Sequence, residues 1–380
     1  MRILVNAISA RLGGGITVLR NLLPALTQVD GGAHEYVVVA HEGAAEAMDP
    51  RHPRVRFEVA RPHDSLASRL SWEQLELPIL TLRDRADLVF SPGGLAVFGS
   101  PRPQVLMYQN MAPFEPRVVA RAPRHEQRRF FLLRELGVLS GRIAHRIVFI
   151  SRYAQRSILP RIGGRALDSR CIYLGRDPAF RPEAAQSPEA TQLLTRLRLP
   201  QRYLLSVSQF YFYKNFVELV EGFARALPLL PADLGLVIAG AEHEVEYARA
   251  VRQRIASRGL ADRVHLVGAV PYADLPSLYA RAHAFIFPST VENFPNILIE
   301  GLSSGAPTFA SKLGPMPEIA GDAASYFDPY EPDDIASALI RAGSDDALRD
   351  TLRARAAIRV QRYAWTRTAR ELLDVFGEIR

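Results

Sequence analysis

Residues 288–305, PSTVENFPNILIEGLSSG, carry the strongest structural signal in this 380-residue chain. The apolar run Ala284–Phe287 just before them predicts a strand, and Pro295 predicts the start of a helix, because proline suits a helical first turn. Glu292 then lies in the turn, and Glu300 lies inside the helix. The stretch therefore predicts a strand–turn–helix unit of an α/β fold, with one acid on each side of the helix start.

This unit suits an anionic ligand that also carries hydroxyl groups. The backbone N–H groups of Asn293, Phe294 and Asn296 surround the positive end of the predicted helix, which attracts a phosphate. Glu300 can accept hydrogen bonds from two vicinal hydroxyls, such as those of a ribose. Alternatively, Glu292 is a loop acid and Glu300 a solvated helix residue. Glu300 stands among apolar residues, however, so we expect it to be buried and to need a partner.

Short apolar runs alternate with helical patterns along the whole chain. Most of these runs are continuously apolar, which is typical of strands buried on both faces of a parallel sheet. Their alternation with helices predicts doubly wound α/β units. The predicted strands are Ile3–Ile8, Tyr36–Ala40, Val55–Val59, Leu88–Ser91, Val105–Tyr108, Arg146–Ile150, Tyr203–Val207, Leu236–Ala239, Val264–Val267, Ala284–Phe287 and Thr308–Ala310, and the clearest predicted helices are Ile16–Gln28, Phe216–Leu227 and Glu246–Arg258.

The length of the chain suits two domains. Arg176–Pro200 is rich in proline and alanine and has no strand pattern, so we place the boundary there. We assign residues 1–178 to a first Rossmann-like domain, 179–200 to a linker and 201–364 to a second Rossmann-like domain. Apolar residues recur at helical spacing within 365–380 and predict an amphipathic terminal helix.

The composition excludes several classes of protein. Apolar residues make up 48% and charged residues 23%, which is typical of a globular protein and excludes disorder and a coiled coil. The single cysteine, Cys171, cannot form an intramolecular disulfide, and no apolar run has the length of a membrane span. The first residues do not have the pattern of a secretory signal. We therefore expect a cytoplasmic protein.

Lysine is scarce, since only Lys214 and Lys312 are lysines among 47 basic residues. Lys214 stands between the predicted strand Tyr203–Val207 and a predicted helix, at the strand edge where α/β sheets bind ligands. A lysine there can neutralise a diphosphate, and the alternative is a solvated helix-capping lysine. We expect Lys312 to lie at the surface.

A glycine loop, Gly13, Gly14 and Gly15, follows the first predicted strand and precedes a helix. Glycine allows a phosphate or sugar oxygen to approach the helix N-terminus closely. Tight strand-to-helix turns also use glycine, so the loop alone is weak evidence. Together with Lys214 and Glu292, it predicts a contribution to a site in a cleft between the domains.

Glu292-x7-Glu300 in this context resembles the E-x7-E signature of retaining GT-B glycosyltransferases of family 4, the group 1 glycosyl transferases. The resemblance covers nearly the whole chain. Its further motifs are the glycine loop, Ser151 opening a helix after a strand, YLGRDP at 173–178, Lys214-Asn215 opening a helix, GPMPE at 314–318, YFDP at 326–329, and Trp365 starting a terminal helix that in the family crosses back onto the first domain.

The resemblance implies a GT-B fold, in which two Rossmann-like doubly wound domains face one another across a cleft. It implies transfer of a sugar from a nucleotide-diphosphate sugar to an acceptor hydroxyl, with retention at the anomeric carbon. Glu300 would bind the ribose, Lys214 the diphosphate, and Glu292 the donor sugar together with the backbone of Asn293 and Phe294. Lys214 and Glu292 are the predicted catalytic residues, and no cofactor is expected besides the donor itself.

The chain departs from the family pattern at two places. Gln209 stands where the family usually has an arginine, five residues before the lysine, so the phosphate site has one hydrogen-bond donor in place of a charge. Gln109 or Asn110 stands where the family commonly has a histidine that touches the donor sugar. Neither amide can act as a general base. A retaining enzyme without a covalent intermediate tolerates this, because the departing phosphate can take the proton.

Other motifs fail on their context. Residues 301–305 match G-x-S-x-G, but they end a predicted helix, whereas a serine-hydrolase elbow must follow a strand. The sequence has no D-x-D, no Cys/His cluster and no Walker loop. We therefore expect no metal at the diphosphate.

Residues 117–156 contain ten arginines against two glutamates, a net charge of +8, and include the apolar run 130–133. This combination favours contact with anionic lipid, at the inner face of a membrane, or with a lipid-linked diphosphate acceptor. An ordinary exposed helix in an arginine-rich protein explains it equally well. Nucleic acid is not an expected partner, because no recognition motif accompanies the charge.

The sequence thus predicts a metal-independent hexosyltransferase of cell-surface polysaccharide or glycolipid assembly, acting on a nucleotide sugar and an acceptor glycan. It leaves open the donor base and sugar, the acceptor, the linkage and the oligomeric state. A pyridoxal-phosphate phosphorylase would need one of the two lysines for a Schiff base. The alternative from another class is a non-catalytic sugar-nucleotide-binding subunit, favoured by Gln209 and the absent histidine.

Overall fold

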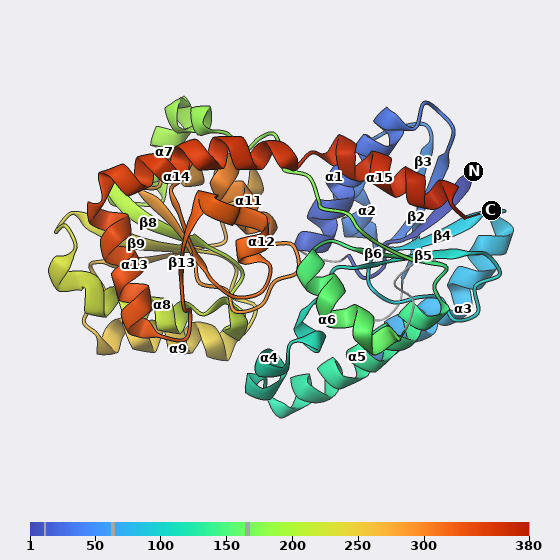
Figure 1. The fold of residues 1–380 in the computed structure, drawn as a ribbon, viewed down its shortest axis with the longest axis horizontal. Helices are drawn as coiled ribbons and strands as arrows, with labels where there is room; N and C mark the ends of the chain where they lie inside the picture. Colours follow the sequence, from blue (N-terminus) through green and yellow to red (C-terminus); the bar gives the residue numbers. More distant parts are fainter. Residues whose placement is uncertain (11–12, 62–64, 164–167, 380) are drawn as a thin grey trace. The chain divides into compact units, whose positions relative to one another are not determined.

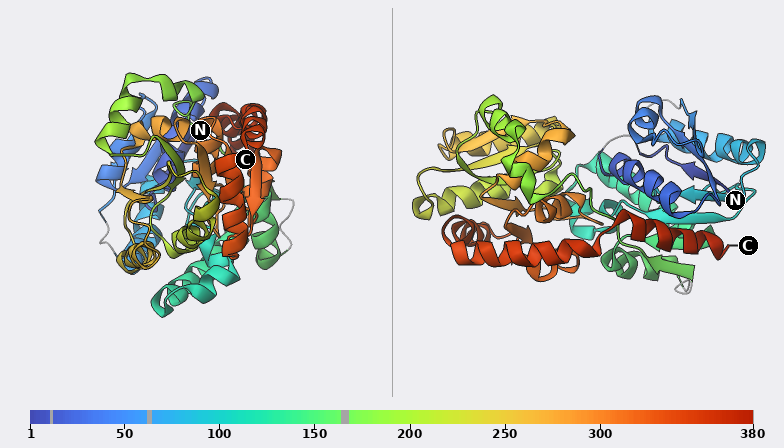
Figure 2. Two further views of the ribbon diagram at one scale, coloured as in Figure 1. Left: turned by 90° about the vertical axis from the view of Figure 1, so that its left-hand side faces the viewer. Right: turned by 90° about the horizontal axis from the view of Figure 1, so that it is seen from above.

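The structure is a computed structural model that describes residues 1–10, 13–61, 65–163 and 168–379. The chain divides into two compact units (Figure 1). The first unit comprises Met1–Gly175 and Tyr363–Arg380, and the second comprises Arg176–Arg362. Each unit is an α/β sandwich with its own parallel sheet and helices on both faces of that sheet (Figure 2).

The first unit contains a seven-stranded sheet in the order β3-β2-β1-β4-β5-β6-β7, and all its pairs are parallel. Its inner strands β4 and β5 are buried at every position and apolar except at Ser91 and Gln104, as expected for strands covered by helices on both faces. The strands are β1 (Arg2–Asn6), β2 (Glu35–Ala40), β3 (Val55–Val59), β4 (Leu88–Ser91), β5 (Gln104–Tyr108), β6 (Arg146–Phe149) and β7 (Ser169–Cys171). The helices are α1 (Gly14–Val29), α2 (Glu42–Met48), α3 (Leu66–Arg83), α4 (Pro116–Arg121), α5 (Arg124–Ile143), α6 (Arg152–Ile162) and α15 (Trp365–Gly377).

The terminal helix α15 completes the first unit, where it packs against α1 (Figure 1). It begins at Trp365, as predicted, and its apolar stripe is buried. The Thr368 hydroxyl donates to the Tyr173 carbonyl at 2.8 Å. A Cβ on Gly175 would lie 2.2 Å from the backbone nitrogen of Trp365, so only glycine permits this approach. The glycine of the YLGRDP motif therefore serves the docking of α15.

The second unit contains a six-stranded parallel sheet in the order β10-β9-β8-β11-β12-β13. Its strands are β8 (Arg202–Val207), β9 (Leu234–Ala239), β10 (Val264–Gly268), β11 (Ala284–Phe287), β12 (Thr308–Ser311) and β13 (Ala324–Phe327). Its helices are α7 (Pro188–Arg196), α8 (Phe216–Ala226), α9 (Val245–Ser257), α10 (Leu275–Ala280), α11 (Asn296–Ser303), α12 (Met316–Ala320), α13 (Pro332–Ser344) and α14 (Asp346–Arg359). The chain adds strands on one side of β8 and then on the other, so the winding reverses at the β8–β11 pair.

Two strands and one helix of the structure lie where the sequence predicted neither. The edge strands β7 and β13 were not predicted, because they are three and four residues long and only partly apolar. The helix α7 lies within the segment 179–200, where we expected a linker. Ser187 starts this helix, since its side chain accepts a hydrogen bond from the backbone N–H of Ala190. In the structure, the segment belongs to the second unit, where α7 packs against α10.

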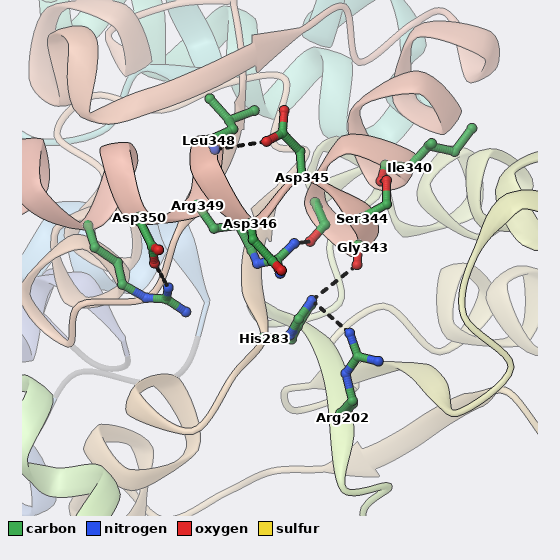
Figure 3. A network of polar contacts seen from close by, with 12 residues as sticks. Arg202, His283, Ile340, Gly343, Ser344, Asp345, Asp346, Leu348, Arg349 and Asp350 are labelled. Atoms are coloured by element: carbon green, nitrogen blue, oxygen red, sulfur yellow. Dashed lines mark hydrogen bonds and ion pairs between the residues drawn. The ribbon is translucent and has the colours of Figure 1, made fainter.

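A cluster of charged residues holds the amino edge of the second sheet, around His283 (Figure 3). The His283 Nε2 atom lies 3.3 Å from the Gly343 carbonyl oxygen and 3.3 Å from an Arg202 guanidinium nitrogen. The buried Arg349 donates to the Ala342 carbonyl at 3.0 Å and pairs with Asp346. Burial, and then the positive charge of Arg349, lower the pKa of His283 to about 4. The histidine is therefore neutral in the folded protein at neutral pH.

His283 should make the protein less stable in acid. The unfolded chain, with an ordinary histidine pKa of about 6.5, takes up a proton that folded His283 takes up only near pH 4. Its contribution to stability is therefore complete above about pH 6.5 and declines as the pH falls towards 4. His283→Gln should flatten this part of the stability profile, measured as denaturation midpoints between pH 7 and 4. The matched control His125→Gln, at a side chain that is 79% exposed, should keep the wild-type slope. An unchanged slope in His283→Gln would contradict the assignment.

Candidate functional site

Two loops meet at the carboxyl edge of the second sheet, where its winding reverses. One loop follows β8 and leads to α8, and the other follows β11 and leads to α11. β8 and β11 are direct neighbours, with Leu204 opposite Ala284 and Leu205 opposite Phe285. The chain adds strands on one side of β8 and then on the side of β11, and open α/β sheets bind ligands where the strand order reverses in this way.

The backbone carbonyl of Tyr213 fastens these two loops together. It accepts hydrogen bonds from the Thr290 backbone N–H at 2.8 Å and from the Thr290 hydroxyl at 3.0 Å. Ser289 is buried beside it. Since Tyr213 precedes Lys214 and Thr290 stands two residues before Glu292, this contact sets the two charged side chains side by side.

The Lys214 ammonium donates to the Glu292 carboxylate at 2.6 Å. The two side chains are only 11% and 14% exposed, so water screens the pair weakly. The Lys214 nitrogen also lies 5.4 Å from the centre of the Tyr213 ring, within the range of a cation–π contact. The structure thus brings together the two residues that the sequence predicts to be catalytic.

The loop that carries Lys214 is held on its other sides as well. Asn215 adopts the left-handed conformation, with φ 65°, and its side-chain amide donates to the Pro329 carbonyl at 2.6 Å. Pro329 ends the YFDP motif, which gives that motif a structural role beside Lys214. The Phe212 backbone N–H donates to the Glu244 carboxylate at 2.9 Å. The loop is therefore anchored before a ligand arrives.

Helix α11 begins one residue later than predicted, so Pro295 is its N-cap residue. Asn293 and Phe294, just before it, are buried at 5% and 6% exposure. Glu300 is 8% exposed and lies among buried apolar residues of the helix, which confirms the prediction that it is buried. Glu300 is therefore not a solvated helix residue, which was the alternative interpretation.

Glu300 has the partners that a buried carboxylate needs, and they are tyrosines that the sequence did not reveal. The Tyr279 hydroxyl donates to it at 3.3 Å. The Tyr272 hydroxyl lies 3.5 Å from its other oxygen and donates to Asp177 at 3.1 Å. Burial, and then the charge of Glu300, raise the pKa of Tyr279 well above its ordinary value, so this phenol stays a donor. Phe180, packed edge-on against both tyrosine rings, holds them in place.

These tyrosines carry little sequence signal. Tyr272 lies in a 3₁₀ turn just before α10, and Tyr279 lies in α10 itself. The spacing of the two tyrosines matches no known ligand-binding motif. Asp177 stands in the YLGRDP motif, but nothing in that motif indicates a contact with residues nearly a hundred positions away.

The other predicted site residues lie as follows. Gln209 is in the same loop as Lys214, two residues after β8. Gly13, with φ 61°, is the N-cap residue of α1, and Gly14 and Gly15 open that helix in the first unit. The binding roles of Gln209 and of the glycine loop stay predictions. Lys312 is 54% exposed and pairs with Asp328 at 3.0 Å, which confirms its surface position.

Two negative predictions can be compared with the structure. Residues 301–305 lie at the end of α11, so the G-x-S-x-G match lacks the strand before the serine that a hydrolase elbow requires. Among the described residues, no group of three His, Cys, Asp or Glu side chains is placed to hold a metal ion. Metal independence itself stays a prediction.

The chain matches a known family over most of its second unit. Residues 195–359 match the family model described as glycosyl transferases group 1. The O-antigen chain mannosyltransferase B of Escherichia coli is 27% identical over 210 residues, which are 54% of this chain and 51% of that protein. A D-inositol 3-phosphate glycosyltransferase of Streptosporangium roseum is 30% identical over 191 residues, 48% of this chain and 44% of that protein. The chain thus spans about half the length of these curated relatives.

Solved structures resemble the chain over its whole length. Anabaena HepE in complex with UDP-glucose superposes with a TM-score of 0.78 at 20% identity, covering 100% of both chains. Sucrose-phosphate synthase from Thermosynechococcus elongatus gives a TM-score of 0.79 at 18% identity, covering 100% of this chain and 98% of the other. At these identities the likeness establishes the fold, which is GT-B. The resemblance that the motifs indicated is confirmed at the level of the fold and of the family model.

Proposed function

Because residues 195–359 match the group 1 glycosyl transferases on a GT-B fold, we propose that this protein is a retaining glycosyltransferase. It moves a sugar from a nucleotide-diphosphate sugar to an acceptor hydroxyl in the assembly of a cell-surface polysaccharide or glycolipid. The observation that carries the proposal is the Lys214–Glu292 ion pair, which lies where the second sheet reverses its winding. The helix that follows Glu292 carries the buried Glu300.

Each charged residue has a role that follows from its place. Glu300 binds the ribose hydroxyls of the donor, with Tyr279 and Tyr272 orienting its carboxylate. Lys214, assisted by Gln209, binds the diphosphate. Glu292 and the backbone of Asn293 and Phe294 bind the donor sugar. Catalysis then consists of positioning and of stabilising the leaving diphosphate, without a metal.

The ion pair explains how one lysine can suffice at the diphosphate. Before the donor binds, Glu292 compensates the charge of Lys214, so the largely buried ammonium has a partner. When the glycosidic bond breaks, negative charge grows on the diphosphate, and the ammonium can interact with it in surroundings that screen weakly. While the donor is bound, the second carboxylate oxygen of Glu292 can accept hydrogen bonds from the sugar hydroxyls. The pair thus connects leaving-group stabilisation to recognition of the sugar.

The donor is expected to be a hexose attached to a nucleoside diphosphate. This expectation draws on the names of the similar proteins, which include mannosyltransferases and a protein solved with UDP-glucose. A thermal-shift screen with UDP, GDP, ADP and TDP identifies the base, because a bound ligand stabilises the folded protein. The alternative, a non-catalytic sugar-nucleotide-binding subunit, predicts the same shifts but no hydrolysis or transfer with any donor.

Lys214 and Glu300 should have separable kinetic effects. Lys214→Ala should lower kcat by about 10²-fold or more, since the diphosphate that Lys214 binds gains negative charge in the transition state. Glu300→Ala should mainly weaken donor binding, by about 1.5–3 kcal/mol for a lost charged hydrogen bond, since the ribose changes little during the reaction. Steady-state kinetics with a saturating donor measure both.

The other lysine supplies the matched control for this comparison. Lys312→Ala, at an exposed side chain, should leave kcat and KM unchanged. If Lys214→Ala keeps a normal kcat and only the donor KM rises, Lys214 does not stabilise the leaving group.

Activity should survive removal of divalent metal ions. The proposed diphosphate site uses Lys214, Gln209 and helix N–H groups, and the sequence has no D-x-D motif to hold a metal. Transfer rates measured in EDTA should therefore equal those in buffer. A loss that Mn²⁺ or Mg²⁺ restores would falsify the metal-free mechanism.

We also propose that α5, in the first unit, contacts an anionic membrane or a lipid-linked diphosphate acceptor. Phe131 and Leu132 are 59% and 43% exposed, and Arg128 and Arg129 beside them are also exposed. Apolar side chains flanked by arginines suit the boundary between headgroups and acyl chains. No helix in the described part of the chain is long and apolar enough to span a membrane.

Reversing charge on α5 should weaken lipid binding. Arg128→Glu with Arg129→Glu should reduce flotation with phosphatidylglycerol vesicles, because attraction to anionic lipid depends on those charges. The matched control Arg249→Glu with Arg252→Glu reverses two exposed arginines on α9 and should float as the wild type does. Equal flotation of the wild type with anionic and neutral phosphatidylcholine vesicles would make α5 an ordinary solvated helix.

A further inference from the structure

Three arginines of the second unit converge on one buried carboxylate, on the helix that follows the Lys214 loop. Glu221 of α8 is 5% exposed. It accepts hydrogen bonds from Arg225, one turn further along α8, at 3.2 Å, and from Arg254 of α9 at 2.9 Å. Arg258, at the end of α9, donates twice, at 2.9 and 2.6 Å. The two helices are therefore joined through a single carboxylate.

Glu221 stays ionised and has its acceptor capacity filled. Burial alone would raise its pKa, but the hydrogen bonds from Arg258 and Arg225 lower it below the ordinary value. Four N–H groups already bond its two oxygens. A guanidinium carries several N–H donors in a planar fork, so one carboxylate leaves many of those on the three arginines unused. The hydrogen bonds to Glu221 thus fix the orientation of the three guanidinium groups.

These arginines line a cavity of about 640 Å³ that is open to solvent. Their side chains are 43%, 35% and 49% exposed for Arg225, Arg254 and Arg258. Glu218, Ser257, Tyr330 and Pro332 complete the wall, so the lining carries three positive and two negative charges. Arg225 also pairs with the exposed Asp333 at 2.8 Å, so two carboxylates share its charge, whereas Arg254 and Arg258 are paired with Glu221.

We propose that this cavity binds the phosphate group of a small phosphate ester, such as a sugar phosphate. Guanidinium groups bind phosphate oxygens through parallel N–H bonds, and groups that are already oriented lose little freedom on binding. The volume is in the range of small-molecule sites and exceeds what a bare phosphate fills. The tyrosine ring and the proline offer apolar surface to the organic part, and Ser257 offers a hydroxyl.

Binding of inorganic phosphate and of glucose 1-phosphate, measured by isothermal titration calorimetry at low ionic strength, tests this site. Arg254→Ala with Arg258→Ala should weaken binding of glucose 1-phosphate by about tenfold or more. Glucose 1-phosphate should bind more tightly than inorganic phosphate, and equal affinities would contradict the ester preference. Binding should fall with added salt, because the arginines are partly exposed.

Control variants separate this cavity from the donor site and from a loss of folding. Lys214→Ala alters the proposed diphosphate site and should leave this binding event in place. Arg249→Ala removes an exposed arginine of the same helix, paired with Glu246, and should bind as the wild type does. Arg254→Lys with Arg258→Lys keeps the positive charge beside Glu221 but loses the planar guanidinium groups. This variant should fold normally but bind glucose 1-phosphate more weakly than the wild type. If Lys214→Ala abolishes binding, or if the double alanine variant binds normally, the arginines only join α8 to α9 and the proposal is wrong.

Discussion

The parallel pairing of β8 with β11 is the constraint on which the site of the second unit depends. It places two loops with opposite onward directions at one sheet edge, and the Tyr213 carbonyl then joins them through Thr290. Lys214 and Glu292, 78 residues apart in the sequence, meet only because of this pairing. A shift of β11 away from β8 would leave a largely buried ammonium without its carboxylate, which is a costly arrangement. Strand order, loop closure and ion pair thus support one another.

Hydrogen bonds from neighbouring elements hold several groups of this site in advance. Asn215 is tied to the β13–α13 connection, and the backbone at Phe212 to Glu244. Glu300 is held by tyrosines that are themselves packed against Phe180. Such fixed groups suit a reaction in which the protein positions a donor and stabilises developing charge, because they need little rearrangement during the reaction.

The second unit uses charged groups for structure as well as for the site. Arg349 is buried beside the amino edge of the sheet, where it contributes to keeping His283 neutral. Glu221 joins α8 to α9 through arginines. Buried charges of this kind add little net stability, since desolvation offsets much of the attraction, but they fix geometry. The arginine-rich composition of the chain is therefore reflected in specific buried contacts and is not confined to the surface.

The sequence by itself determined the parts of this protein that depend on local composition. Continuous apolar runs predicted the inner strands to within two residues at each end, because burial on both faces requires apolar side chains at every position. The apolar neighbours of Glu300 predicted its burial for the same reason. The short edge strand β7 and the helix α7 lack such a pattern, since one is partly exposed and the other is set by its Ser187 cap. Only the tertiary structure decided which residues meet, because contacts between distant residues depend on strand order. Three sets of contacts were decided in this way: the hydrogen bonds of Thr290 to Tyr213, those of the tyrosines to Glu300, and those of the three arginines to Glu221.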